Sequence, residues 1–260
     1  MRLPIYQIDA FADQVFGGNP AAVIPLKKWL PDETMQQIAM ENNLSETAFF
    51  IPFENGFHIR WFTPATEVNL CGHATLATAY VLFNHLKFNE KEIRFQSRTG
   101  VLKVKKEGEL IVLDFPTSEV KKAELPANIE KAFGIKPQKS FKGREDLMFV
   151  FVNHEAIENL KPDFHFLKTL EMRGIIATAP SEKFDFVSRF FAPREGIDED
   201  PVTGSAHTML IPYWAERLGK KELVAKQISK RGGVLYCKYL GERVEIGGKA
   251  VTYLVGEITV

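Results

Sequence analysis

The chain repeats a set of short motifs in its two halves, and this repeat limits the folds open to it. The run Arg60-Trp61-Phe62-Thr63-Pro64 returns as Arg189-Phe190-Phe191-Ala192-Pro193, an offset of 129 (189 minus 60). The run Gly72-His73-Ala74 returns as Gly204-Ser205-Ala206, an offset of 132 (204 minus 72). Both offsets are about half of the 260 residues, and the order is kept. The repeat therefore indicates two domains of the same fold.

Each repeat leads into a segment with the pattern of a buried helix. Residues 74–86 and 206–215 contain no formally charged side chain if His85 is neutral, and apolar residues cover most of a helical wheel. A helix that is apolar on all sides is buried. We predict buried helices beginning near Gly72 and near Gly204. Pro212 is expected to kink the second helix or to shorten its first part.

Most of the remaining chain has the pattern of short strands between turns. An outer helix is predicted over 30–40, opened by Pro31-Asp32. We expect an α/β fold of two halves, each a curved sheet around one buried helix. The predicted domains are 1–117 and 118–248. The last strand, about 249–260, is expected to cross back to the first domain, which leaves the C-terminal boundary soft.

Composition excludes several function classes. Thirty-three basic residues balance thirty-three acidic ones, so no long-range field draws the chain to nucleic acid or to an anionic membrane. No stretch has the length of a membrane span, and the first residues lack the apolar run of a signal peptide. The two cysteines, Cys71 and Cys237, form no Cys-x-x-Cys pair. A cytoplasmic protein with a locally built anion site is expected.

Glu46 is the first candidate for chemistry. It stands between a predicted helix and the apolar strand that begins at Thr47-Ala48-Phe49-Phe50. A carboxyl group against phenylalanines is poorly solvated, and desolvation raises a carboxyl pKa towards the range that suits an acid–base catalyst. The alternative is a solvated glutamate at the start of a strand.

The two predicted helix starts are the next candidates. Free backbone N–H groups and the helix dipole make a helix start an anion site, and Gly72 would let a ligand approach the backbone. His73 could orient a ligand or share a proton. In the second half, the run 198–205 places Asp200 and Ser205 at the equivalent start. The alternatives are a capping loop with a hydrogen-bonded histidine and carboxylates that serve the helix dipole.

No cofactor or metal is expected. The chain has no Gly-x-Gly-x-x-Gly, no Walker A pattern and no His-Glu-x-x-His, and its six histidines lack a metal-ligand spacing.

Taken together and in order, these clusters resemble the PhzF family of phenazine-biosynthesis-like proteins. The resemblance also includes Asp9-Ala10-Phe11, the run from Gly18 to Val23, Arg60 to Pro64, and Ile246 to Ala250, so it covers nearly the whole chain. Each motif alone is weak, whereas the ordered set is specific.

The resemblance implies a fold similar to diaminopimelate epimerase, with two pseudo-symmetric domains and commonly a homodimer. In the PhzF enzyme a glutamate moves a proton on a dihydro-hydroxyanthranilate. The motif match gives that role to Glu46 and supporting roles to His73 and Asp200, acting on a small anionic carboxylate substrate. The candidates for substrate binding are Gly72, Gly204, Ser205, Cys71 and Asn19.

One departure from the related epimerases bears on the reaction. Diaminopimelate epimerases use two opposed cysteines, one at each helix start, but residues 200–205 contain none. Two-thiol racemisation is therefore not expected. Two alternatives stay open: a racemase or epimerase that uses Glu46 and Cys71, and a non-catalytic small-molecule-binding protein on the same fold. The presence of Glu46, His73 and Asp200 together favours an enzyme.

Overall fold

The computed structural model describes all residues, 1–260, and the chain divides into two compact units. The N-terminal unit comprises 1–115 and 246–260, and the C-terminal unit comprises 116–245. None of the helices has the length and apolar composition needed to cross a membrane.

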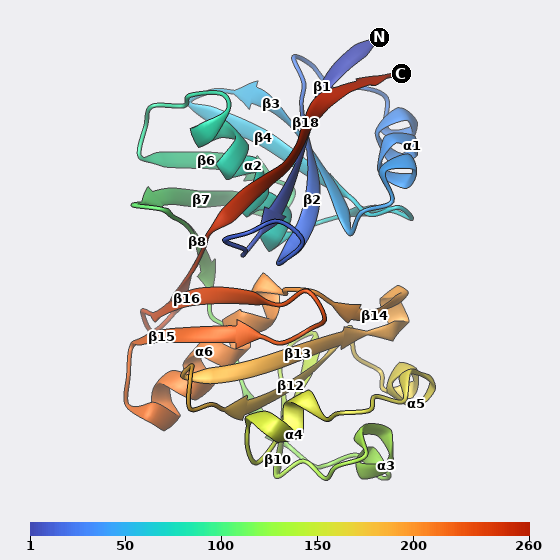
Figure 1. Cartoon of the computed structure of the whole chain (residues 1–260), viewed down its shortest axis with the longest axis vertical. Coiled ribbons are helices and arrows are strands. Elements are labelled where there is room, and N and C mark those ends of the chain that lie inside the picture. Colours follow the sequence, from blue (N-terminus) through green and yellow to red (C-terminus); the bar gives the residue numbers. More distant parts are fainter. The chain divides into compact units, whose positions relative to one another are not determined.

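The N-terminal unit is a mixed sheet with one central helix (Figure 1). Strand β1 pairs with β18 on one side and with β2 on the other; β2 runs parallel to β3, which continues antiparallel to β4. Strand β4 pairs with the short β5 and, in parallel, with β6, and β7 and β8 follow as antiparallel neighbours. The elements are β1 Arg2–Ala10, β2 Asn19–Pro25, α1 Asp32–Asn42, β3 Glu46–Phe53, β4 Gly56–Phe62, β5 Glu67–Val68, α2 Gly72–Asn84, β6 Glu92–Ser97, β7 Gly100–Glu107, β8 Leu110–Pro116 and β18 Ala250–Thr259.

The C-terminal unit repeats this order of pairing. Strand β11 runs parallel to β12, which is antiparallel to β13; β13 pairs with the short β14 and, in parallel, with β15, and β16 follows. Strands β9 and β10 extend the sheet beyond β11. The elements are β9 Lys121–Ala123, α3 Ile129–Phe133, β10 Lys139–Lys142, β11 Asp146–Val150, α4 His154–Glu158, α5 Phe164–Thr169, β12 Gly174–Pro180, β13 Phe186–Ala192, the 3-10 turn η1 Pro193–Glu195, β14 Ile197–Asp200, α6 Gly204–Leu218, β15 Glu222–Gln227, β16 Gly233–Tyr239 and β17 Arg243–Gly248, which crosses the boundary between the units.

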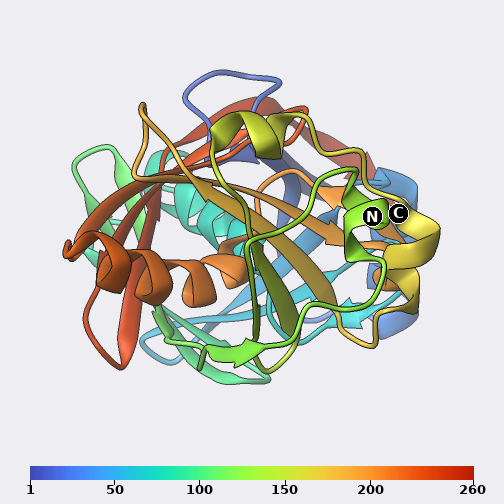
Figure 2. The same cartoon turned by 90° about the horizontal axis from the view of Figure 1, so that it is seen from below.

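Alternating side chains explain why the C-terminal sheet takes helices on both faces. On β13, Phe186 stacks on Trp214 of α6, with ring centroids 5.7 Å apart, whereas Val187 and Phe191 join the core that includes residues of α3, α4 and α5. Helix α6, orange in Figure 2, packs against β15 and β16. In the N-terminal unit, Phe62 of β4 likewise belongs to the core under α1.

The expected fold class is confirmed: two similar units, each with a mixed sheet and a largely buried central helix. The predicted helix starts at Gly72 and Gly204 are also confirmed. Of the two effects expected of Pro212, shortening is excluded, because α6 continues through it to Leu218. A proline cannot donate to the carbonyl four residues back, and here that carbonyl, on Thr208, accepts from the backbone N–H of Ser118 at 3.1 Å.

Candidate active site

Glu46 is held at the end of the N-terminal sheet by the turn that precedes it. Helix α1 ends at Asn43, whose left-handed backbone (φ 48°) reverses the chain. Asn42 Nδ2 donates to Thr47 Oγ1 at 3.1 Å, which ties the helix end to the strand. Glu46 then begins β3 opposite Ala21 of β2. The predicted position, directly before an apolar strand, is confirmed, and 14 % of the side chain stays exposed.

His73 is the polar neighbour of Glu46. It is the second residue of α2, and its Nε2 lies 3.0 Å from Glu46 Oε2. Both atoms are buried, and this contact is an ion-pair distance rather than an aligned hydrogen bond, since neither atom has a hydrogen-bond partner. Two of the three predicted catalytic residues are therefore in direct contact, although 27 positions (73 minus 46) separate them in the sequence.

Two further predicted residues lie at the other edge of the same imidazole. Asn19 Nδ2 is 3.2 Å from His73 Nδ1, and Cys71 Sγ is 3.5 Å from it. Both side chains are buried, and Asn19 is fully inaccessible. Three functional groups thus meet around one imidazole: the amide and the thiol at Nδ1 and the carboxylate at Nε2.

Burial decides which of these groups carry charge. It raises the pKa of Cys71 to about 11, and the Glu46 charge adds to the effect, so Cys71 is a neutral thiol at pH 7. For His73, burial lowers the pKa, while Cys71 and Glu46 raise it well above its usual range. The contribution of Cys71 needs a thiolate. With Cys71 neutral at pH 7, burial and Glu46 act on the pKa of His73 in opposite directions.

The same three side chains were tested as a metal site. Ligand atoms of Glu46, Cys71 and His73 lie within 4.8 Å of one another. However, His73 turns Nδ1 to Cys71 and Nε2 to Glu46. A metal ion at one ring nitrogen would need both other ligands turned towards that nitrogen, whereas here they face different nitrogens. The arrangement fits proton sharing better than metal coordination.

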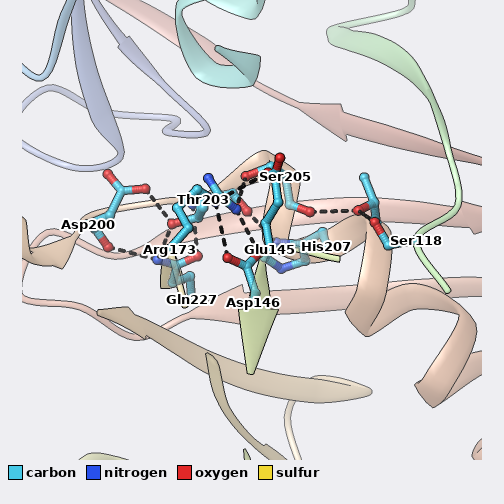
Figure 3. A network of polar contacts seen from close by, with 10 residues as sticks. Ser118, Glu145, Asp146, Arg173, Asp200, Thr203, Ser205, His207 and Gln227 are labelled. Atoms are coloured by element: carbon cyan, nitrogen blue, oxygen red, sulfur yellow. Dashed lines mark hydrogen bonds and ion pairs between the residues drawn. The ribbon is translucent and has the colours of Figure 1, made fainter. Parts of the chain in front are cut away.

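Asp200, Gly204 and Ser205 gather at the start of α6 in the C-terminal unit (Figure 3). Thr203 Oγ1 donates to Asp200 Oδ2. Gln227 fixes the same turn, because its Oε1 accepts from Thr203 N at 2.9 Å and its Nε2 donates to Asp200 O at 2.8 Å. Asp200 therefore sits in a turn that is held by side chains.

Neither central helix has a side-chain cap at its first turn. The residue before α2 is Cys71 and the residue before α6 is Thr203, and neither side chain caps the helix by a hydrogen bond from its backbone. The short helices α4 and α5, in contrast, are capped by Asn153 and Asp163. The starts of α2 and α6 thus leave their first N–H groups available to an anion.

Several residues that shape the helix start of the C-terminal unit were not predicted from the sequence. Arg173 binds both oxygens of Asp146, at 3.1 and 2.6 Å, and reaches Ser205 Oγ at 3.3 Å (Figure 3). Burial raises the pKa of Asp146, and Arg173 opposes that change. No local motif marks Arg173, Asp146 or Gln227, because each stands far from Ser205 in the sequence.

A second feature that was not predicted, a pair of arginine–glutamate ion pairs, does have a signal in the sequence. Arg60 forms a two-pronged ion pair with Glu67, and Arg189 forms one with Glu199. The two arginines were visible in the repeat, and the two glutamates are related by the same offset as the helix starts, 132 (199 minus 67). Extending the repeat to single charged residues would have found both pairs.

Comparison with known proteins now identifies the family. The family model described as "Phenazine biosynthesis-like protein", PhzC-PhzF, matches residues 8–256. The chain belongs to the PhzF family. The predicted resemblance is therefore confirmed over nearly the whole chain.

Relatives within the PhzF family support an enzyme. An uncharacterized isomerase of Pseudomonas aeruginosa is 50% identical over 258 residues, covering 99% of each chain. A crystal structure of a PhzF-family phenazine biosynthesis protein from Enterococcus faecalis matches with a TM-score of 0.98, at 48% identity and 100% coverage of both chains. The predicted assignment as an isomerase is confirmed at this level.

The PhzF fold extends to more distant proteins. A hydroxyproline epimerase from Agrobacterium vitis shares it with a TM-score of 0.65 at 8% identity, covering 99% of this chain and 92% of that one. This similarity concerns the fold alone.

Proposed function

We propose that this PhzF-family protein is a cofactor-independent isomerase in which Glu46 moves a proton within a small carboxylate-bearing metabolite. The observation that carries the proposal is the buried contact of 3.0 Å between Glu46 Oε2 and His73 Nε2. It occupies one carboxylate oxygen and leaves Oε1, on the partly exposed side of the group, to meet a substrate. A carboxylate that is oriented on one side and open on the other suits proton transfer.

The proposed reaction conserves all atoms. A substrate C–H bond breaks, its proton goes to Glu46 Oε1, and the electron pair spreads into an adjacent conjugated group. The Glu46 O–H bond then breaks, and the proton forms a C–H bond at another carbon of the same substrate, so that a double bond shifts. His73 keeps the carboxyl group in place throughout. Because one group accepts and returns the proton, the step needs no oxidant or reductant.

The uncapped start of α2 supports a carboxylate substrate. Gly72 and His73 supply backbone N–H groups there, and the helix dipole favours a negative charge. Bound at this helix start, a substrate would stand beside the carboxyl group of Glu46. We assign Asp200, Gly204 and Ser205 supporting roles in binding the polar groups of the substrate.

The geometry favours this isomerase over a racemase that uses Cys71. A two-base racemase needs its acid and base on opposite sides of one substrate carbon. Here Cys71 is buried, and its sulfur lies within 4.8 Å of a carboxylate oxygen of Glu46, which leaves no room for a substrate carbon between the two groups. Its pKa of about 11 also leaves little thiolate at neutral pH.

Glu46→Gln tests the proposal, because it keeps the shape of the side chain and removes its titrating proton. The probes are 2,3-dihydro-3-hydroxyanthranilate and a panel of small unsaturated carboxylates, incubated in D₂O and followed by proton NMR. Deuterium incorporation by the wild type should fall by about 10³-fold or more in Glu46→Gln. Binding of 3-hydroxyanthranilate, measured by the shift in melting temperature, should remain.

Glu222→Gln is the matched control, because Glu222 is an exposed glutamate at the start of β15 whose ion-pair partner is Lys238. Its rate of deuterium incorporation should equal that of the wild type. Undiminished deuterium incorporation in Glu46→Gln would show that another residue carries the proton. Cys71→Ser would then be examined first.

A further inference from the structure

Asn19 has a role in the structure other than direct contact with a substrate. Its side chain is fully buried, and its amide nitrogen lies 3.2 Å from His73 Nδ1. A fully buried amide cannot meet a ligand without a rearrangement of the chain around it. One of its partners is the histidine beside Glu46, so it can act on the chemistry through His73.

An amide nitrogen can only donate hydrogen bonds. Facing Asn19 Nδ2, His73 Nδ1 must accept, which means that Nδ1 carries no proton. The single proton of a neutral imidazole then lies on Nε2, the nitrogen 3.0 Å from Glu46. The orientation of Asn19 thereby selects the tautomer in which His73 donates to the carboxylate.

Cys71 acts in the same direction. Its sulfur lies 3.5 Å from Nδ1, and burial keeps it a protonated thiol at neutral pH, so it is a second donor at the same edge. A charged imidazolium would carry a proton on Nδ1 as well, directed at two donors. The arrangement at this edge therefore disfavours the doubly protonated ring.

The loop before Asn19 is built tightly enough to fix the amide. Gly18 has φ +62°, and a Cβ at this position would lie 2.1 Å from the carbonyl oxygen of Ala10. Phe11 (φ 62°) and Phe16 (φ 71°) also adopt left-handed backbone, which bulky residues rarely do. Asp9, itself buried, accepts from Phe16 N at 2.8 Å. Backbone strain of this kind is typical of segments that position functional groups.

We infer that Asn19 is a positioning residue that holds His73 as the neutral Nε2–H tautomer, with Cys71 as a second donor, so that the proton on Nε2 faces Glu46 Oε2. The inference rests on the proposed function of Glu46. Its chemical reason is that a neutral donor orients the carboxylate without placing a full positive charge beside it, and so leaves it able to take a proton from carbon.

The direct test is the protonation of the His73 ring in the wild-type protein. Nitrogen NMR of the ¹⁵N-histidine-labelled protein at pH 7, with the His73 signals assigned from their loss in His73→Gln, distinguishes the three states of the ring. A proton on Nε2 alone is expected. A proton on Nδ1, alone or with one on Nε2, would overturn the inference. This measurement needs no substrate, so its result is independent of whether Glu46 acts as proposed.

Asn19→Asp is the informative variant, because it replaces the facing donor by an acceptor of the same shape. The ring should then gain a proton on Nδ1, and deuterium incorporation should fall by about 100-fold or more, since the wrong tautomer of a catalytic histidine is severely inhibitory. Asn153→Asp is the matched control; Asn153 caps α4 through its oxygen, and its replacement should leave ring and rate unchanged.

An unchanged ring in a folded Asn19→Asp would also overturn the inference. If that variant does not fold by circular dichroism, Asn19→Ser, which can keep a donor, and the wild-type spectrum decide the question. A wild type without proton exchange on any probe would instead count against the proposed function alone.

Discussion

The two units share one plan of construction but differ at the position where chemistry is proposed. In both, an arginine on the antiparallel strand binds a glutamate on the short strand that follows: Arg60 with Glu67 at 2.7 Å twice, and Arg189 with Glu199 at 2.7 and 2.9 Å. The strand before that arginine begins with Glu46 in the N-terminal unit. In the C-terminal unit the corresponding strand begins with Gly174.

The C-terminal unit has no room for a second Glu46. A Cβ at Gly174 would lie 2.1 Å from Phe190 Cζ and 2.6 Å from Asp146 Oδ1. At the helix start, Ser205 replaces His73, and it contacts Arg173 rather than a carboxylate. The repeat has thus kept the ion pair that braces the sheet and varied the residues beside the helix. This asymmetry suits an enzyme that uses one carboxylate rather than two opposed bases.

The shared ion pairs give the largest expected effect. Arg189→Leu should lower the free energy of unfolding by ~3–5 kcal/mol, because it leaves the largely buried Glu199 without this partner. Arg60→Leu should lower it by somewhat less, because Glu67 keeps an ion pair with the half-exposed Arg98. The side chains of Arg60 and Arg189 are only 11% and 14% exposed. Urea denaturation at pH 7 measures both. Arg94→Leu, which removes an exposed pair with Glu92, should cost less than ~1 kcal/mol. A large loss in one unit only would break the comparison.

The next effect separates the two central helices by pH. His207 of α6 is fully buried, and burial lowers its pKa to about 4, whereas its counterpart in α2 is Thr75, which does not titrate. Above pH 6.5 the folded and unfolded forms of His207 are both neutral. As pH falls from 6.5 towards 4, only the unfolded form gains a proton, so the native state loses stability.

His207→Phe removes this titration. Relative to the variant, the wild type should lose ~2–3 kcal/mol of unfolding free energy between pH 7.5 and pH 4.5, as measured by urea denaturation at both values. The difference between the two proteins cancels the titration of the many surface carboxylates. A difference in unfolding free energy that stays constant with pH would show that the pKa of His207 is not lowered in the native state.

A smaller effect is expected where the two units diverge. Gly174→Ala should destabilise the protein by ~1–3 kcal/mol, because the ring of Phe190 and the carboxylate of Asp146 must move to admit one methyl group. Gly256→Ala is the control, since its Cβ would meet neighbours only at 3.6 Å and beyond. Equal stability of the two variants would mean that Gly174 is not required by packing.

The smallest effect contrasts a capped helix start with the uncapped ones. Asn153 Oδ1 accepts from Ala156 N at 2.9 Å, and Asn153→Ala should cost ~1 kcal/mol in thermal or urea denaturation. The rate of deuterium incorporation should not change, because this start serves structure alone. A fall in rate with retained stability would place α4 in the catalytic machinery.

The sequence predicted the parts of the fold that depend on apolar patterning. The uncharged runs after Gly72 and Gly204 indicated buried helices, and both helices begin at those residues. The apolar strand after Glu46 was read correctly for the same reason. Burial of a continuous apolar segment is a local property of the sequence, so it can be recognised without knowing its partners.

Elements formed by long-range partners were not predictable. Strand β14, Ile197–Asp200, is not indicated by the sequence, because Asp-Glu-Asp has low strand propensity. It becomes a strand by pairing with β13 and by the ion pair of Glu199 with Arg189. The burial of Asn19 was equally hidden, since a polar residue in a Gly-Asn-Pro run is typical of an exposed turn.

Strand β18 has a consequence for synthesis of the chain. It lies antiparallel to β1, with Arg2 opposite Thr259, so β1 leaves the ribosome long before the strand that pairs with it. Residues 116–245 are complete in sequence before 246–260 have been made, and they can fold first. Until then β1 has a partner only in β2, and its other edge presents unpaired backbone groups. The unit proposed to carry the catalytic glutamate thus completes its sheet only after residues 246–260 have been made.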